Sequence, residues 1–331
     1  MEKKHLAKQC GQDNIGFVKE KVGNELFKDE FLRNDQYYLF REKALMVDKY
    51  GKTMYEWNQD NEAKYLIPSD FLKKHGLSPE ARERMVDWMI EVFSVNKSEP
   101  GTFELAVHIM DSYILNTNKI LKDEDIHLIG LTSIYIASKM EEKIPMRLIH
   151  IVNNLGKGVF SKAEIIAMEK EIVETIEFDF FTAGTYDYLM TFFWDLKVNN
   201  GQILNDFKEH DVIDKYMKFC IFLSKLTLFN HKFAAYSTSL IAVGILTLGF
   251  DFLKRNNQIK EKKLMKFLQD WIFYLMNEMK FNPDAVGYVY LKIYDLYKLD
   301  ILERIKDNDE SSDINSDDVP NLFKLYTDYM F

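Results

Sequence analysis

The sequence is short of the residues that interrupt regular structure. Glycine and proline contribute only 14 and 6 of its 331 residues, about half of their usual combined share. Because these residues mark turns, their scarcity favours long helices over many short strands. Two cysteines, Cys10 and Cys220, are too few for a disulfide framework. Without a CxxC or a helically spaced histidine pair, we expect no metal and no cofactor.

Long apolar runs and a basic charge balance are missing as well. The longest nearly apolar stretch, 239–250, is shorter than the ~20 residues of a membrane helix. The charged start of the chain also lacks the apolar core of a secretory signal. With 43 basic and 52 acidic residues, the formal net charge is −9, which argues against broad nucleic-acid binding. We expect an intracellular protein of the nucleus or cytoplasm, with no membrane or nucleic-acid partner.

Apolar residues instead recur at helical spacing. Ser78 and Pro79 are typical of a helix start, and Met85, Trp88 and Met89 then share one face. In the first half, this pattern predicts helices from 78, over 103–115, from 125, over 147–153 and over 161–176. In the second half, it predicts helices near 185–196, 211–228, 235–250, 261–280 and 284–299.

The two sets of helices repeat each other. Each set contains a helix that is apolar almost all round, and Leu128 and Leu240 in these two helices lie 112 residues apart. We therefore expect an all-α fold of two five-helix units, 78–183 and 184–300. An arm with one helix (35–50) precedes them in 1–77, and an acidic tail with an apolar end follows in 301–331. The apolar end, 321–331, either folds back on the body or docks a partner.

Charged residues interrupt the apolar faces at four places: Arg82, Asp111, Lys139 and Glu169. A charge buried alone costs several kcal/mol, so each needs a partner or a boundary position. Arg82 and Asp111 are interpreted most simply as an internal ion pair. Lys139 either complements the end of its helix dipole or, with Glu169, forms a contact site.

Several separate segments carry a family resemblance. ARERMVDWMIEV, LAVHIMDSYIL, HLIGLTSIYIASKMEE and AMEKEIVETIEFDF follow one another in the order and spacing of the cyclin box. STSLIAVGIL resembles the second cyclin fold, and YYLFREKALM and DFLKKHG resemble the lead-in of B-type, mitotic cyclins. The resemblance covers about residues 37–300. It implies two tandem cyclin folds and a non-enzymatic regulatory subunit that binds and activates a cyclin-dependent Ser/Thr protein kinase in cell-cycle control.

The resemblance also implies roles for individual residues. Arg82 and Asp111 match a buried structural pair that holds the box together. The resemblance implies two groups of kinase-binding residues. Lys139, Met140, Glu141 and Glu142 lie at the end of the third helix of the box, whereas Glu169 lies in its last helix and Phe178 just after it.

One patch departs from the family pattern. Many cyclins dock Arg-x-Leu motifs of their substrates on an apolar surface, of which Met85 and Trp88 are retained here. Arg84 places a charge in this patch, and His127 stands where glutamine is usual. We expect docking of protein substrates through this altered patch to be weakened.

The sequence offers less support for other functions. No P-loop, GxGxxG or HExxH motif indicates an enzyme. A double cyclin fold that binds DNA would call for a basic face, which the acidic composition disfavours. A cyclin-fold scaffold or transcriptional regulator without kinase activation is the main alternative.

Overall fold

The computed structural model describes residues 58–180, 183–201, 204, 207, 211–256 and 258–298. Within these ranges every regular element is helical, and no strand occurs. The prediction of an all-α fold is confirmed. The predicted helix at 35–50 and the tail 301–331 lie outside the described residues, as does most of the predicted arm. Residues 56–331 group into one compact unit.

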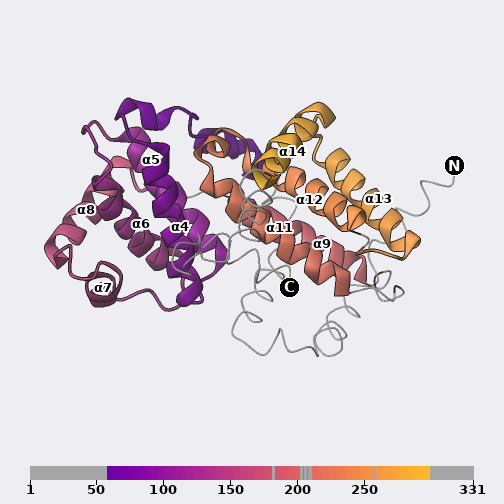
Figure 1. Ribbon diagram of the computed structural model, residues 1–331, viewed down its shortest axis with the longest axis horizontal. Coiled ribbons are helices and arrows are strands. Elements are labelled where there is room, and N and C mark those ends of the chain that lie inside the picture. The colour runs from indigo at the N-terminus through magenta and orange to yellow at the C-terminus, as the bar shows by residue number, and fades with distance from the viewer. Residues whose placement is uncertain are drawn as a thin grey trace, which may run out of the picture. The chain divides into compact units, whose positions relative to one another are not determined.

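The first helical bundle contains the helices from α4 to α8 (Figure 1). Two 3-10 turns precede it, η2 (Glu62–Tyr65) and η3 (Phe71–Lys74). Its elements are α4 (Pro79–Val95), α5 (Pro100–Asn116), α6 (Asp125–Glu141), α7 (Leu148–His150), the π-helical turn η4 (Ile151–Leu155) and α8 (Lys162–Thr175).

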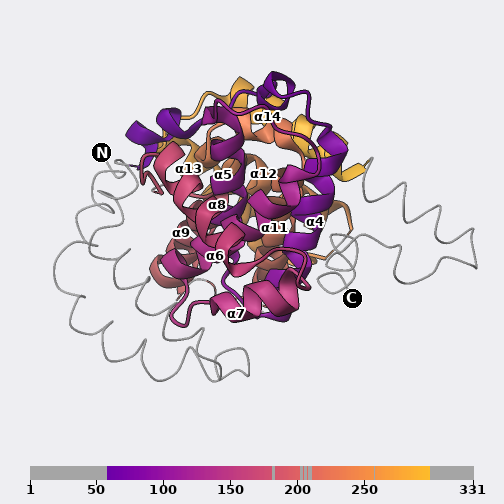
Figure 2. The same cartoon turned by 90° about the vertical axis from the view of Figure 1, so that its left-hand side faces the viewer.

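Local signals fix where these helices begin. The Ser78 hydroxyl accepts a hydrogen bond from the Ala81 N–H, and Pro79 occupies the first helical position of α4. At α8, Ser161 and Glu164 form a reciprocal capping box. The largely apolar helix α6 packs against α4, α5 and α8, which makes it the centre of the bundle. Figure 2 turns this bundle toward the viewer.

The second bundle repeats the scheme around another apolar helix. Its elements are α9 (Thr185–Asn199), α11 (Asp211–Phe229), the 3-10 turn η5 (His231–Ala235), α12 (Thr238–Arg255), α13 (Lys262–Glu278) and α14 (Pro283–Tyr297). Helix α12 packs against α9, α11, α13 and α14, so it takes the place that α6 has in the first bundle. The sequence placed its start three residues too early, because the turn η5 and its connection occupy the segment up to Ser237.

Two buried acidic side chains of α5, two helical turns apart, take part in joining the two bundles. Asp111 accepts hydrogen bonds from Arg82 of α4, whose guanidinium also donates to carbonyls at the end of α11. Glu104 accepts a hydrogen bond from the backbone N–H of Tyr186 in the first turn of α9. The first bundle therefore supplies a cation to one helix C-terminus of the second bundle and a carboxyl group to one helix N-terminus, in keeping with the helix dipoles.

In the ranges that the structure describes, none of the helices has the length and apolar character that crossing a bilayer requires. Among the same residues, no three His, Cys, Asp or Glu side chains gather in a way that could hold a metal ion.

Candidate functional site

Lys139 and Glu169 form a partly exposed ion pair between two helices. The ammonium group of Lys139, in the last turn of α6, donates to Oε1 of Glu169 near the middle of α8. One turn earlier on α6, the ring of Tyr135 lies under this ammonium, with its centroid 4.3 Å from Nζ. Partial burial lowers the pKa of Lys139. The two side chains remain 34% and 22% exposed, so the pair is held in place and accessible.

Two large apolar side chains stand exposed on the same two helices or just beyond them. Met140 follows Lys139 directly and is 53% exposed. Phe178, in the turn after α8, is 70% exposed and has a left-handed backbone with φ 59°. The N–H of Phe178 donates to the carbonyl of Val173 (3.0 Å), a backbone bond that commonly ends a helix with left-handed residues. The neighbouring Asp179 forms a partly exposed ion pair of 2.5 Å with Lys64.

The two glutamates at the end of α6 differ in their surroundings. Glu141 is exposed on the surface. Oε1 of Glu142 accepts hydrogen bonds from the Glu99 N–H (3.1 Å) and the Thr102 hydroxyl (2.7 Å). Glu142 therefore ties the end of α6 to the start of α5 and thereby fixes the helix end that carries Lys139.

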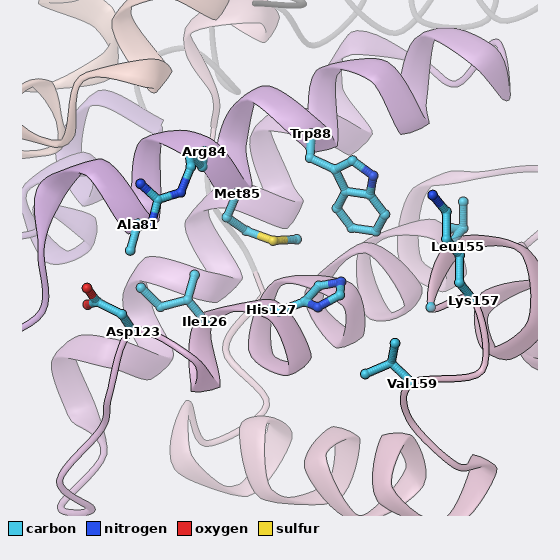
Figure 3. A pocket seen from close by; sticks show the side chains of 11 residues that line it. Ala81, Arg84, Met85, Trp88, Asp123, Ile126, His127, Leu155, Lys157 and Val159 are labelled. Carbon is cyan, nitrogen blue, oxygen red and sulfur yellow. The ribbon is translucent and has the colours of Figure 1, made fainter. Parts of the chain in front are cut away.

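The altered patch lines a groove of about 390 Å³ between α4, α6 and the segment after η4. Figure 3 shows Met85 and Trp88 of α4 facing His127 of α6 across it. Leu155 and Val159 complete its apolar lining at the other end. Sequence reasoning named Arg84, Met85, Trp88 and His127 for this surface. It missed the contribution of 155–159, which it treated only as an interhelical turn.

Aromatic packing fixes His127 in the groove. Its ring meets Trp88 edge-on, with centroids 5.6 Å apart, and also contacts Phe160 at 5.1 Å. Burial lowers the pKa of His127, which favours the neutral imidazole. Gly130, one turn further along α6, leaves room for Met85: a Cβ there would come within 2.6 Å of the Met85 Cγ.

Charged residues lie at both ends of the groove. Arg84 and Asp123 lie near one end and Lys157 near the other (Figure 3). Both carboxylate oxygens of Asp123 are used by Ser78, which donates from its backbone N–H (2.9 Å) and its hydroxyl (2.6 Å). These hydrogen bonds lower the pKa of Asp123. The groove thus combines an apolar lining with two basic side chains and one acidic side chain.

Arg82 and Asp111 are almost fully buried, at 1% and 2% exposure. Nε and Nη2 of Arg82 donate to the two carboxylate oxygens at 2.8 and 2.7 Å. The guanidinium also donates to the carbonyls of Leu228 (3.1 Å) and Phe229 (2.9 Å). The pair therefore spans both bundles and is part of the framework that supports the site, a connection that the sequence did not indicate.

A second buried acidic side chain, Glu104, was missed entirely. Glu104 of α5 is 6% exposed, and burial raises its pKa to about 8. Burial lowers the pKa of Lys225, on α11, to about 8, while the nearby Glu104 opposes this shift. The signal was present, because Glu104 stands in the apolar run Phe103–Val107 just as Asp111 stands among apolar neighbours.

Comparisons with known proteins agree with this architecture. Residues 53–180 match the family model described as "Cyclin, N-terminal domain". The G2/mitotic-specific cyclin-B3 of Gallus gallus is 31% identical over 44% of this chain and 35% of its own length. The G2/mitotic-specific cyclin-B1 of Caenorhabditis elegans is 30% identical over 38% of this chain and 34% of its own length. The matches thus span about a third of the length of these relatives.

Among solved structures, a chain of the yeast RNA Pol II CTD kinase CTDK-1 complex has a TM-score of 0.51. It is 13% identical, and the match covers 78% of this chain and 80% of that one. This similarity concerns the fold alone. Residues 53–180, which include the first bundle, are similar to the N-terminal domain of cyclins, and 44% and 38% of the chain are similar to two B-type cyclins.

Proposed function

We propose that this chain is a regulatory subunit that binds and activates a cyclin-dependent Ser/Thr protein kinase. The match of residues 53–180 to the cyclin N-terminal domain supports the proposal. The observation that carries it is the ion pair of Lys139 and Glu169, held on two packed helices and flanked by the exposed Met140 and Phe178. An accessible charge pair beside exposed apolar side chains is typical of a protein-binding surface.

The pair keeps hydrogen-bonding capacity for a partner. An ammonium group has three donors and a carboxylate about four acceptor positions, so their mutual bond leaves several of each. We infer that Lys139 donates to kinase backbone carbonyls and that Glu169 accepts from kinase backbone N–H groups. Met140 and Phe178 would bury apolar area beside them. Glu141 lies at the rim of this surface, and Glu142 holds the helix end in place.

Activation follows from selective binding. A protein kinase is active when the glutamate of its αC helix pairs with its β3 lysine. A helical partner that binds only this arrangement shifts the population toward it. The chain itself would contribute no catalytic group. The names of its relatives refer to G2 and mitosis, and we infer a cell-cycle role in the nucleus or cytoplasm.

The site is tested by two single substitutions and a matched control. The kinase recovered with the wild-type chain is titrated with Lys139→Ala, Glu169→Ala and, as control, Lys170→Ala. Lys170 neighbours Glu169 on α8 and pairs with Glu174 at 3.7 Å, but both of these side chains are well exposed. Removing one partner of a desolvated charge pair costs about 2–5 kcal/mol. We therefore expect kinase binding to weaken about tenfold or more for the first two variants and to be unchanged for the third.

The outcomes separate the site from the function. If all three variants bind as the wild type does, a kinase is still bound but the assigned contacts are wrong. If no kinase is recovered with the wild-type chain and no phosphorylation of a Ser/Thr-Pro substrate accompanies it, the activating role is wrong. The chain would then be a cyclin-fold scaffold or a transcriptional regulator without kinase activation.

The groove gives a separate proposal about protein substrates. We infer that Arg-x-Leu docking is weakened in this chain, because Arg84 would meet the basic residue of such a motif with a like charge. The retained Met85 and Trp88 still offer an apolar surface. A ligand without a basic residue at that position would fit it better.

A further inference from the structure

The groove between α4 and α6 is suited to a segment that is both apolar and acidic. Its lining is apolar along Met85, Trp88 and Val159, and Val159 is 65% exposed. Arg84 and Lys157 add two positive charges at its ends, while Asp123 already accepts two hydrogen bonds from Ser78. An occupant therefore needs apolar side chains for the lining and carboxylates for the ends.

The sequence of this chain contains such a segment outside the described residues. Residues 307–318 carry six acidic side chains and no basic one. Residues 321–331 follow with the apolar and aromatic sequence NLFKLYTDYMF. By contrast, residues 1–57 carry 11 basic and 10 acidic side chains and offer no such charge match. We propose that residues from the apolar segment 321–331 occupy the groove between α4 and α6, with Asp317 and Asp318 near its basic side chains.

The connection is long enough for this. Residues 299–320, which follow the end of α14, comprise 22 residues. Fully extended, they span about 70 Å. A compact body of this size has a radius of gyration of about 18 Å, hence a diameter of about 45 Å. Half its circumference is about 70 Å, so residues 321–331 can reach any point on the surface, the groove included.

Such an occupant would regulate docking. Exposed ion pairs are screened by salt, so occupancy of the groove should fall as ionic strength rises. A substrate segment would have to displace residues 321–331 before it could bind. This consequence rests on the proposed function, whereas occupancy of the groove does not.

The test identifies the occupant directly in the full chain. Val159 is replaced by the photo-crosslinking residue benzoylphenylalanine, and the crosslinked peptides are identified by mass spectrometry after irradiation. The matched control carries the same residue in place of Tyr274, which is 54% exposed on α13 in the second bundle. We expect crosslinks from position 159 to residues 307–331 within one molecule, and much weaker ones from position 274.

A charge swap tests the chemistry. Arg84→Glu with Lys157→Glu should lower the crosslink yield about three- to fivefold, as expected for the loss of two exposed ion pairs. Asp317→Lys with Asp318→Lys, added to these changes, should restore part of it. A melting curve for each variant confirms that the fold is retained.

Four results would overturn the proposal. The first two are crosslinks from position 159 to a second copy of the chain, and crosslinks from position 159 to neighbouring residues alone. The third is an equal crosslink yield to the tail from positions 159 and 274. The fourth is a crosslink yield that stays the same after the charge swap. None of these results bears on kinase binding, which the Lys139 and Glu169 variants test separately.

Discussion

Replacing Arg82 by methionine should destabilise the whole described body, although Arg82 is buried and is not among the residues that we assign to kinase binding. Methionine keeps much of the apolar stem and removes the guanidinium, which donates to Asp111 of α5 and to Leu228 and Phe229 at the end of α11. The carboxylate of Asp111, 2% exposed, would then be buried without its counter-charge.

The magnitude follows from that unpaired carboxylate. Removing one member of a buried ion pair typically costs about 3–5 kcal/mol, more than the loss of the two carbonyl hydrogen bonds. For a body of this size, each kcal/mol lowers the melting temperature by about 2–4 °C. We therefore expect a drop of about 10 °C for Arg82→Met.

Thermal and denaturant unfolding of four variants measures the effect: Arg82→Met, Asp111→Asn, their combination and a control. Arg82→Met with Asp111→Asn removes both charges, so it should recover part of the loss. Lys197→Ala breaks the exposed pair of Lys197 and Asp214, which also joins two helices, and should cost less than about 1 kcal/mol. A melting temperature of Arg82→Met equal to that of the wild type would refute the buried-pair argument. So would a double variant whose loss equals the sum of both single losses.

Two further predictions concern the junction and the groove. The pKa of Glu104 is raised, so the folded state holds a proton that the unfolded state releases, and the free energy of unfolding should fall as pH rises from about 5 to about 8. Denaturant titrations at several pH values should show that the unfolding free energy of Glu104→Gln depends less on pH. The same pH dependence in the wild type and the variant would contradict this expectation. Gly130→Ala places a methyl group against Met85 and should cost about 1–3 kcal/mol of unfolding free energy. Met85→Ala creates a cavity of its own, so the double variant should lose less than the sum of the two single losses; a loss equal to that sum would show that Met85 is not the obstacle.

Helix positions were predictable because their signals are local. A capping serine followed by proline marks the start of α4, and a capping box marks α8, regardless of what the rest of the chain does. The start of α12 was misplaced where that logic fails. There the side chain of Asn230 accepts from the Lys232 N–H and opens the turn η5, inside a stretch whose composition suits a helix equally well.

Partners across the two bundles were not predictable by the same means. The rule that flags a charge on an apolar face points to Asp111 and applies equally to Glu104. It does not reveal that Glu104 accepts from the Tyr186 N–H, 82 positions away. A backbone group has no side-chain signature, so only the folded chain identifies it. The same limit hid the carbonyls that Arg82 contacts, and the part of the groove formed by 155–159.

The placement of these buried groups bears on how the exposed pair could act. A partner that selects one kinase conformation needs a rigid surface. A deformable surface would bind both conformations equally well and would leave their populations unchanged. Helices α6 and α8 carry the exposed pair, and both pack on α5. Helix α5 is tied to the second bundle directly through Glu104, and indirectly through Asp111, whose partner Arg82 donates to carbonyls at the end of α11. The second bundle would thereby support the contact surface without touching the kinase through it. A substitution that loosens α5 should then reduce kinase activation more than an equally destabilising substitution on α13, the helix that carries the exposed Tyr274.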